Sequence, residues 1–237
     1  TSGKGGTGKT SITGGVAGSL ARLGHSVLCI DMDIGLRNLD ISLGLSDRAL
    51  MDFSDVAEGR CPLVRAAVNH PDLPGLALLT APMTLSSALT EEAVRRMLDT
   101  ARSLYDYILI DSPAGLGTGF RMACCGADRA IVVSTNDASS LRDAQRTVGE
   151  LDFLRQIHLV MNRIQPKLLR QLRTTIDDAM DTAGLPLLGV VPEDPQVMLS
   201  ANLGRPLILG GRQGAANACL NIAKRLEGRR VPIMRIR

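Results

Sequence analysis

The sequence predicts an α/β fold: a doubly wound, mostly parallel sheet with helices on both faces. Two observations lead to this prediction. Short apolar runs rich in Ile, Val and Leu recur along the 237 residues, and most are apolar throughout, as parallel strands covered on both faces are. Helical patterns separate these runs, and strands that alternate with helices form right-handed βαβ units.

The expected strands are residues 27–30, 76–79, 107–110, 130–133, 157–161 and 187–191. A glycine-rich loop begins at Gly3, and such a loop normally follows a buried strand, which we do not find before it. Residues 1–228 are therefore expected to form one domain that lacks its first strand. Residues 229–237 are expected to form a separate basic and apolar tail.

One expected helix starts after Thr90, which can cap its N-terminus. The apolar positions of this helix form a single stripe at residues 94, 97, 98, 101 and 104. Further helices are expected over residues 10–23, 141–155, 168–183 and 215–226. Gly24, Gly184 and Gly228 follow three of these helices, where a C-cap requires a positive φ.

The composition fits one large domain, because 45% of the residues are apolar and 22% are charged. Aromatic residues are scarce, with no Trp, two Tyr and three Phe, which argues against base stacking with single-stranded nucleic acid. The five cysteines contain no C-x-x-C pair, so we expect reduced thiols and a cytoplasmic protein. No apolar run approaches the roughly 18 residues of a membrane-spanning helix.

Charge is unevenly placed along the chain. Residues 212–237 hold seven Lys or Arg and one Glu, a net +6 in a chain of net +3, which leaves the remaining residues at −3. A basic tail on a mildly acidic body favours an anionic partner, although cations also suit the C-terminal end of a helix.

The motif G-x-x-x-x-G-K-[ST] predicts a phosphate-binding loop. Its residues are Gly3, Lys4, Gly5, Gly6, Thr7, Gly8, Lys9 and Thr10. Glycines let backbone N–H groups point at phosphate oxygens, and the helix that follows adds its positive N-terminal dipole. Lys9 can reach the β and γ phosphates, and the Thr10 hydroxyl can bind Mg²⁺. ATP and Mg²⁺ are the expected ligands.

Two carboxylates are expected beside this loop. Residues 107–110 form an apolar strand that ends at Asp111, a pattern that delivers a carboxylate to Mg²⁺, through a water molecule. Asp33 lies just beyond the strand at 27–30 and is the second candidate ligand. Asp31 points to the other side of that strand, so we expect it to have a structural role.

Lys4 is a second lysine in the loop, and with it the sequence resembles the deviant Walker A family of P-loop ATPases, which includes the MinD and ParA proteins. Residues 31–40 (DMDIGLRNLD), 111–115 (DSPAG), 139–144 (SSLRDA), 190–194 (VVPED) and 200–202 (SAN) match the MinD branch, and the resemblance covers nearly the whole chain.

The resemblance implies roles for individual residues. Lys4 would reach across a dimer interface to the partner's nucleotide, Asp33 would orient the attacking water, and Lys4, Lys9, Asp33 and Asn38 are the catalytic candidates. Ser11 keeps a hydroxyl for the α-phosphate. The implied adenine and ribose site consists of Asn162, Arg163, Pro192, Glu193 and Asp194. A turn without ligand contact is an equal interpretation of residues 192–194.

The resemblance also implies a switch that helps to place the division septum. ATP would draw two copies into a homodimer that binds a MinC-like inhibitor and a MinE-like activator, at the inner face of the cell membrane. ATPase activity would be weak until stimulated. Leu116-Gly117 depart from the Ile-Glu that many MinD sequences carry there, which puts some regulatory or dimer contacts in doubt.

The tail is a candidate membrane contact through Arg229, Arg230, Val231, Ile233, Met234 and Ile236. Pro232 makes this short segment a poor helix, so a final strand or an irregular end is the alternative. Two other functions stay open. One is a ParA-type or flagellar-number-type ATPase whose basic patch at Arg163, Lys167, Arg170 and Arg173 meets DNA, which the switch segments disfavour. The other is an iron–sulfur carrier that uses Cys124 and Cys125.

Overall fold

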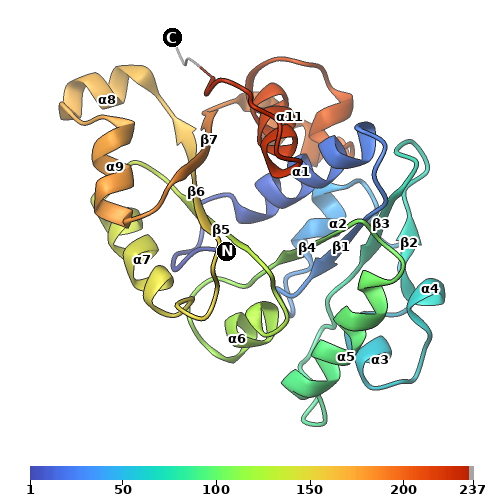
Figure 1. Cartoon of the computed structure of the whole chain (residues 1–237). Coiled ribbons are helices and arrows are strands. Elements are labelled where there is room, and N and C mark those ends of the chain that lie inside the picture. The colour runs from blue at the N-terminus through green and yellow to red at the C-terminus, as the bar shows by residue number, and fades with distance from the viewer. Residues whose placement is uncertain (235–237) are drawn as a thin grey trace.

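A computed structural model describes residues 1–234 (Figure 1). Its strands are β1 (Val27–Asp31), β2 (Val68–Asn69), β3 (Leu76–Leu79), β4 (Tyr107–Asp111), β5 (Ala130–Ser134), β6 (Ile157–Ile164) and β7 (Leu187–Pro192). Its helices are α1 (Lys9–Arg22), α2 (Asn38–Ser42), α3 (Phe53–Ala57), α4 (Leu63–Ala66), α5 (Glu91–Arg102), α6 (Thr118–Cys124), α7 (Ala138–Gly149), α8 (Pro166–Leu172), α9 (Ile176–Ala183), α10 (Pro195–Asn202), the 3-10 helix η1 (Leu207–Leu209) and α11 (Gly214–Leu226).

The strands form two sheets, with the orders β2-β3-β1-β4 and β5-β6-β7. All pairings are parallel except that of β2 with β3. Each of the six expected strands is confirmed to within a few residues at its ends. The short antiparallel β2 is an addition, because two residues carry no periodicity that could reveal a strand.

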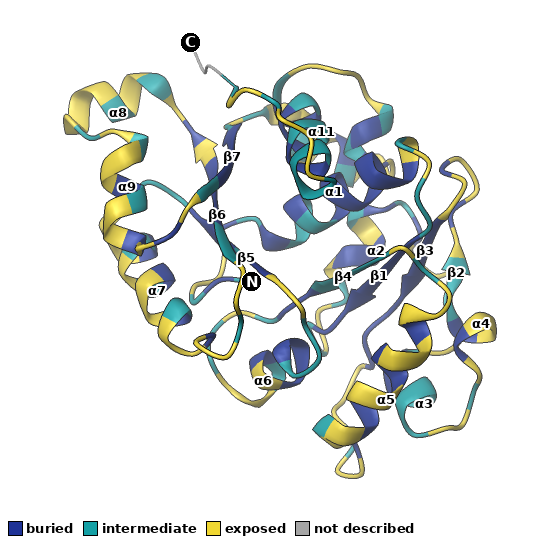
Figure 2. Cartoon of the chain, in the orientation of Figure 1, coloured by how far each residue is buried: buried dark blue, intermediate teal, exposed yellow. Residues whose placement is uncertain are grey.

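Helices cover both faces of the sheets, as the doubly wound prediction requires (Figures 1 and 2). Alternate residues of β1 show this directly. Val27 and Cys29 pack into a core with α1 and α11, whereas Leu28 and Ile30 pack into a second core with α3 and α5. A third core, which includes Leu159, lies under α9. The apolar runs are therefore buried on both sides.

Two expected helices differ from the structure. Residues 168–183 form two helices, because Arg173 adopts a left-handed conformation (φ 52°) and Thr175 with Asp178 forms a capping box that starts α9. Helix α7 ends at Gly149 instead of continuing to residue 155. Thr90 caps α5 as expected, but Leu104 lies beyond the helix and is 45% exposed. Gly24, Gly184 and Gly228 have the predicted positive φ.

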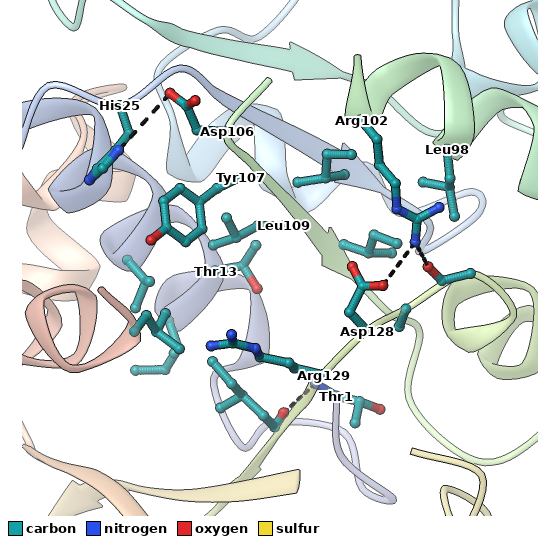
Figure 3. Close-up of a pocket in the computed structure, with 18 of the residues that line it drawn as sticks. Thr1, Thr13, His25, Leu98, Arg102, Asp106, Tyr107, Leu109, Asp128 and Arg129 are labelled. Carbon is teal, nitrogen blue, oxygen red and sulfur yellow. Dashed lines mark hydrogen bonds and ion pairs between the residues drawn. The ribbon is translucent and has the colours of Figure 1, made fainter. Parts of the chain in front are cut away.

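A cleft of about 730 Å³ separates the two sheets, between the facing edges of β4 and β5 (Figure 3). Apolar side chains such as Leu109 and Ile131 line it. At one end the amino group of Thr1 donates to the carbonyl oxygen of Ile131 (2.8 Å). The N–H of Val133 in turn donates to the carbonyl oxygen of Thr1 (2.8 Å). These two bonds are the pattern of a parallel ladder. The strand that normally precedes a phosphate loop is not among the described residues, and it stays a prediction.

Joining an apolar, β-branched segment of about five residues to Thr1 should raise the melting temperature, because that segment can pair with β4 and β5 at once. Burying two or three aliphatic side chains contributes several kcal/mol, which corresponds to about 10 °C in a domain of this size. Thermal unfolding followed by circular dichroism measures the shift. A Gly-Ser segment of equal length is the control, and equal melting of the two fusions would contradict the expectation.

The cysteines at positions 29, 61, 124, 125 and 219 are free thiols, as expected. Over residues 1–234, no helix has both the length and the apolar character that crossing a membrane requires.

Candidate functional site

The phosphate loop leads directly into α1, which begins at Lys9. Gly6 (φ 79°) and Gly8 (φ 87°) both have left-handed backbone conformations that glycine adopts without strain. These residues curl the chain so that the loop closes over the first turn of α1. The motif is therefore placed as predicted, with a helix N-terminus where phosphates would bind.

Lys9 is almost completely buried, at 7% exposure. Its Nζ donates to Ser2 Oγ (3.0 Å) and to the carbonyl oxygen of Lys4 (3.4 Å). Ser2 is also buried and accepts a hydrogen bond from the hydroxyl of Thr7 (3.1 Å). Ser2 lies outside the glycine-rich motif and was not among the predicted site residues, although its hydroxyl joins both sides of the loop.

Two acidic residues lie within electrostatic reach of Lys9. Burial lowers the pKa of Lys9, and the charges of Asp111 and Asp33 oppose that shift. Burial likewise raises the pKa of Asp111 and of Asp33, with Lys9 acting in the opposite direction on each carboxyl. Asp111 is 2% exposed and accepts a hydrogen bond from the Thr13 hydroxyl (3.3 Å). The predicted Lys9, Asp33 and Asp111 are thus brought together.

Asp31 supports the segment that carries Asp33. Its carboxylate accepts hydrogen bonds from the backbone N–H groups of Asp33 (2.9 Å) and Leu39 (3.1 Å). Burial raises the pKa of Asp31 to about 7, against the effect of these two donors. Its expected structural role is consistent with this placement. Asn38, the first residue of α2, is exposed, and its predicted catalytic role stays a proposal.

Lys4 lies at the rim of the loop with its side chain 43% exposed. Its Nζ donates to Ser139 Oγ (2.7 Å) and to Asp137 Oδ1 (3.3 Å). Burial would raise the pKa of Asp137, but hydrogen bonds from Ser139, Thr135, Ser140 and Lys4 outweigh it and hold this pKa well below its usual range. Asp137 was not predicted as a site residue. The feature of the sequence that could have indicated it is the short polar run before α7.

A second cleft, of about 380 Å³, extends from the phosphate loop to the ends of β6 and β7. It is lined by Lys4, Gly5, Gly6, Thr7, Thr135, Asn136, Asp137, Arg163, Gln165, Leu168, Leu169, Leu172 and Glu193. Arg163 and Glu193 form an ion pair at its mouth (2.8 Å). The cleft therefore places a polar pair and apolar side chains of α8 where an adenosine could lie.

The other predicted base-site residues differ in position. The carboxylate of Asp194 is held by the backbone N–H groups of Gln196 (2.9 Å) and Ala215 (2.8 Å), so it caps α10 and anchors the start of α11. The predicted contact of Asp194 with the adenine or ribose stays a prediction. Pro192 is the last residue of β7. The Asn162 amide points at the phosphate loop, with Nδ2 donating to the carbonyl oxygen of Thr7 (2.8 Å).

The residues around Lys9 fit a magnesium nucleotide. Mg²⁺ prefers oxygen donors, and here a buried carboxylate (Asp111), a half-buried one (Asp33) and the hydroxyl of Thr10 gather at a helix N-terminus. Ser11, the next residue of α1, is only partly buried. Within residues 1–234 no group of three or more His, Cys, Asp or Glu side chains is arranged to hold a metal ion.

The tail follows α11 without forming a helix or strand over residues 229–234. Arg225 holds it on the body, with Nε donating to the carbonyl oxygen of Val231 (2.9 Å) and Nη2 to that of Pro232 (2.5 Å), while Nη1 donates to Leu188 of β7 (2.8 Å). Met234 packs against the core under α1 and α11. Ile236, one of the predicted membrane contacts, lies outside the described residues.

Comparisons with known proteins agree with this geometry. The sequence model of one protein family, the CobQ/CobB/MinD/ParA nucleotide binding domain, matches residues 1–207. The chain is 39% identical to the septum site-determining protein MinD of Synechocystis over 99% of its length and 90% of that protein, and 39% identical to MinD of Bacillus subtilis over 98% and 89%.

Solved structures give the same result. The MinC:MinD cell division protein complex of Aquifex aeolicus superposes with a TM-score of 0.92 at 37% identity, covering 99% of this chain and 96% of that one. MinD of Pyrococcus horikoshii complexed with Mg-ADP gives 0.84 at 28% identity, covering 96% and 93%.

Proposed function

Because this chain belongs to the MinD branch of the CobQ/CobB/MinD/ParA nucleotide-binding family, we propose that its phosphate loop works as an ATP-driven dimerising switch. It is a MinD-like ATPase that helps to position the division site. One observation carries the switch proposal: the two lysines of the loop occupy different environments. Lys9 is buried beneath the loop, whereas Lys4 is exposed at its rim.

In the hydrolysis of ATP to ADP and phosphate, each residue of the site has its own role. Backbone N–H groups of the loop and Lys9 hold the β and γ phosphates, which fixes the phosphorus for attack by water. Asp33 accepts a hydrogen bond from that water and orients it. Thr10, Asp33 and Asp111 would hold Mg²⁺, and the metal would supply positive charge that offsets the negative charge of the phosphates.

Lys4 gives a physical basis for dimerisation. In a face-to-face dimer, the Lys4 ammonium can leave Ser139 and Asp137 and meet the γ-phosphate bound by the other copy. The γ-phosphate would also order the segment around residues 33–39, whose backbone is already tied to Asp31. Loss of that phosphate removes both attractions, so the copies separate.

Partners follow from the same switch. A MinC-like inhibitor would bind the ATP dimer, in line with the MinC:MinD complex of Aquifex aeolicus, and a MinE-like activator would stimulate weak basal hydrolysis. Cytoplasmic dimers would dock on the inner face of the cell membrane through Arg229, Arg230, Val231, Ile233, Met234 and Ile236. Ile233 is 40% exposed, and basic residues flank it, as interfacial contact requires.

Liposome co-sedimentation tests the switch and its tail together. With anionic vesicles, the protein should pellet in ATP and stay in the supernatant in ADP. Each cation near the surface contributes about 1 kcal/mol, so a dimer with two tails binds far more tightly than a monomer. Deleting residues 229–237 should remove most of this pelleting, and neutral vesicles are the control. Equal pelleting in ATP and ADP would rule out nucleotide control, whereas equal pelleting without the tail would rule out the tail.

A further inference from the structure

We propose that Asn162 is a positioning residue of the phosphate loop, which it joins to the strand at the base end of the nucleotide cleft. The inference rests on the proposed nucleotide site. Asn162 is 6% exposed, and its Nδ2 donates to the carbonyl oxygen of Thr7 over 2.8 Å, across 155 residues of sequence. The donor of this amide is therefore engaged by the loop.

The backbone at the end of β6 separates Asn162 from its neighbour. The pairing of β6 with β7 shifts between Met161 and Ile164, and Arg163 has a left-handed conformation (φ 56°). As a result, Asn162 turns under the loop, while Arg163 turns outward to Glu193 and lines the cleft. Asn162 thus faces the phosphate end of the proposed nucleotide site, and Arg163 faces its base end.

The bond to Thr7 sets the direction of a phosphate donor. The peptide between Thr7 and Gly8 is planar and trans, so its carbonyl and its N–H point in opposite directions. Because Asn162 holds the carbonyl on the β6 side, the Gly8 N–H must face the other way, into the curl of the loop. Orientation of this donor before any ligand arrives is the preorganisation that phosphate binding requires.

Gly8 shows how tightly the two parts meet. Its φ is +87°, and a Cβ added there would overlap Nδ2 of Asn162. The amide therefore lies directly against the Thr7–Gly8 peptide, and there is no room for a side chain at position 8.

Two ligands separate this role from base recognition: ATP and inorganic triphosphate, which has no base, each with Mg²⁺. Asn162→Ala and the isosteric Asn162→Asp, which lacks the donor, should weaken both ligands by a similar factor of about ten or more, as expected for an unsatisfied buried carbonyl. Arg163→Ala is the matched control and should weaken ATP more than triphosphate. Isothermal titration calorimetry measures all four proteins.

If the Asn162 variants lost affinity for ATP but bound triphosphate like the wild type, Asn162 would be a base-reading residue and the proposal would be wrong. A wild-type chain that bound neither ligand would instead refute the nucleotide site itself. Hydrogen–deuterium exchange of the ligand-free proteins gives a second readout. Amides of residues 5–9 should exchange faster in Asn162→Asp than in the wild type, and unchanged exchange would overturn the proposal even if affinity fell.

Discussion

The Lys9→Ala variant should bind ATP at least a hundredfold more weakly than the wild type. Lys9 is the buried cation of the site, and its ammonium group already faces inward beneath the loop. Two charge-assisted hydrogen bonds to phosphate at roughly 1.5–3 kcal/mol each account for a loss of this size. The variant also leaves Asp111 and Asp33 without their compensating cation, so the carboxylates would repel the incoming phosphates.

Binding of a fluorescent ATP analogue measures the loss. Lys224→Ala, on α11, is the control for removal of a lysine elsewhere, and it should bind like the wild type. Circular dichroism should show that Lys9→Ala remains folded. Wild-type affinity in a folded Lys9→Ala protein would mean that the phosphates bind somewhere other than this loop.

The Lys4→Ala variant should keep ATP binding but lose ATP-dependent dimerisation. Lys4 is at the rim, and its present partners are Ser139 and Asp137 of the same chain, so its removal leaves the pocket around Lys9 intact. A symmetric dimer would lose the contact twice. Two charged hydrogen bonds correspond to a weakening of dimerisation by roughly a hundredfold or more.

Analytical ultracentrifugation with a non-hydrolysable ATP analogue and with ADP tests this expectation. The wild type should sediment as a dimer only with the analogue, and Lys4→Ala as a monomer with either nucleotide. Lys224→Ala is again the control. The role of Lys4 in trans would be falsified if the variant dimerised as fully as the wild type while binding nucleotide normally.

Much of the fold follows from the sequence because parallel strands leave a simple pattern. Residues 76–79 were expected as a strand and form β3 without any shift, since both faces of this strand are buried. The break between α8 and α9 was missed because the apolar spacing continues across it. Thr175 and Asp178 were the available signal, a capping box inside an expected helix.

The phosphate loop was predictable for a different reason: its chemistry requires particular residues at fixed spacing. Contacts distant in sequence were not predictable. Asp137 holds Lys4 only because folding brings the start of α7 beside the loop. The adenine contact of Asn162 stays a prediction. Its bond to Thr7 was not expected, because the turn at Arg163 sets the direction of the amide and no local pattern reveals that direction.

Arg225 has a consequence for how the tail can leave the body. One guanidinium donates to Leu188 of β7 and to two successive carbonyls of the tail, so the two bonds to the tail are lost when the tail lifts away. At about 1 kcal/mol net for each hydrogen bond, losing the two bonds to the tail would cost roughly 2 kcal/mol. In the proposed switch, the guanidinium would hold the tail of a single subunit on the body, and the combined attraction of two tails in a dimer would favour its release.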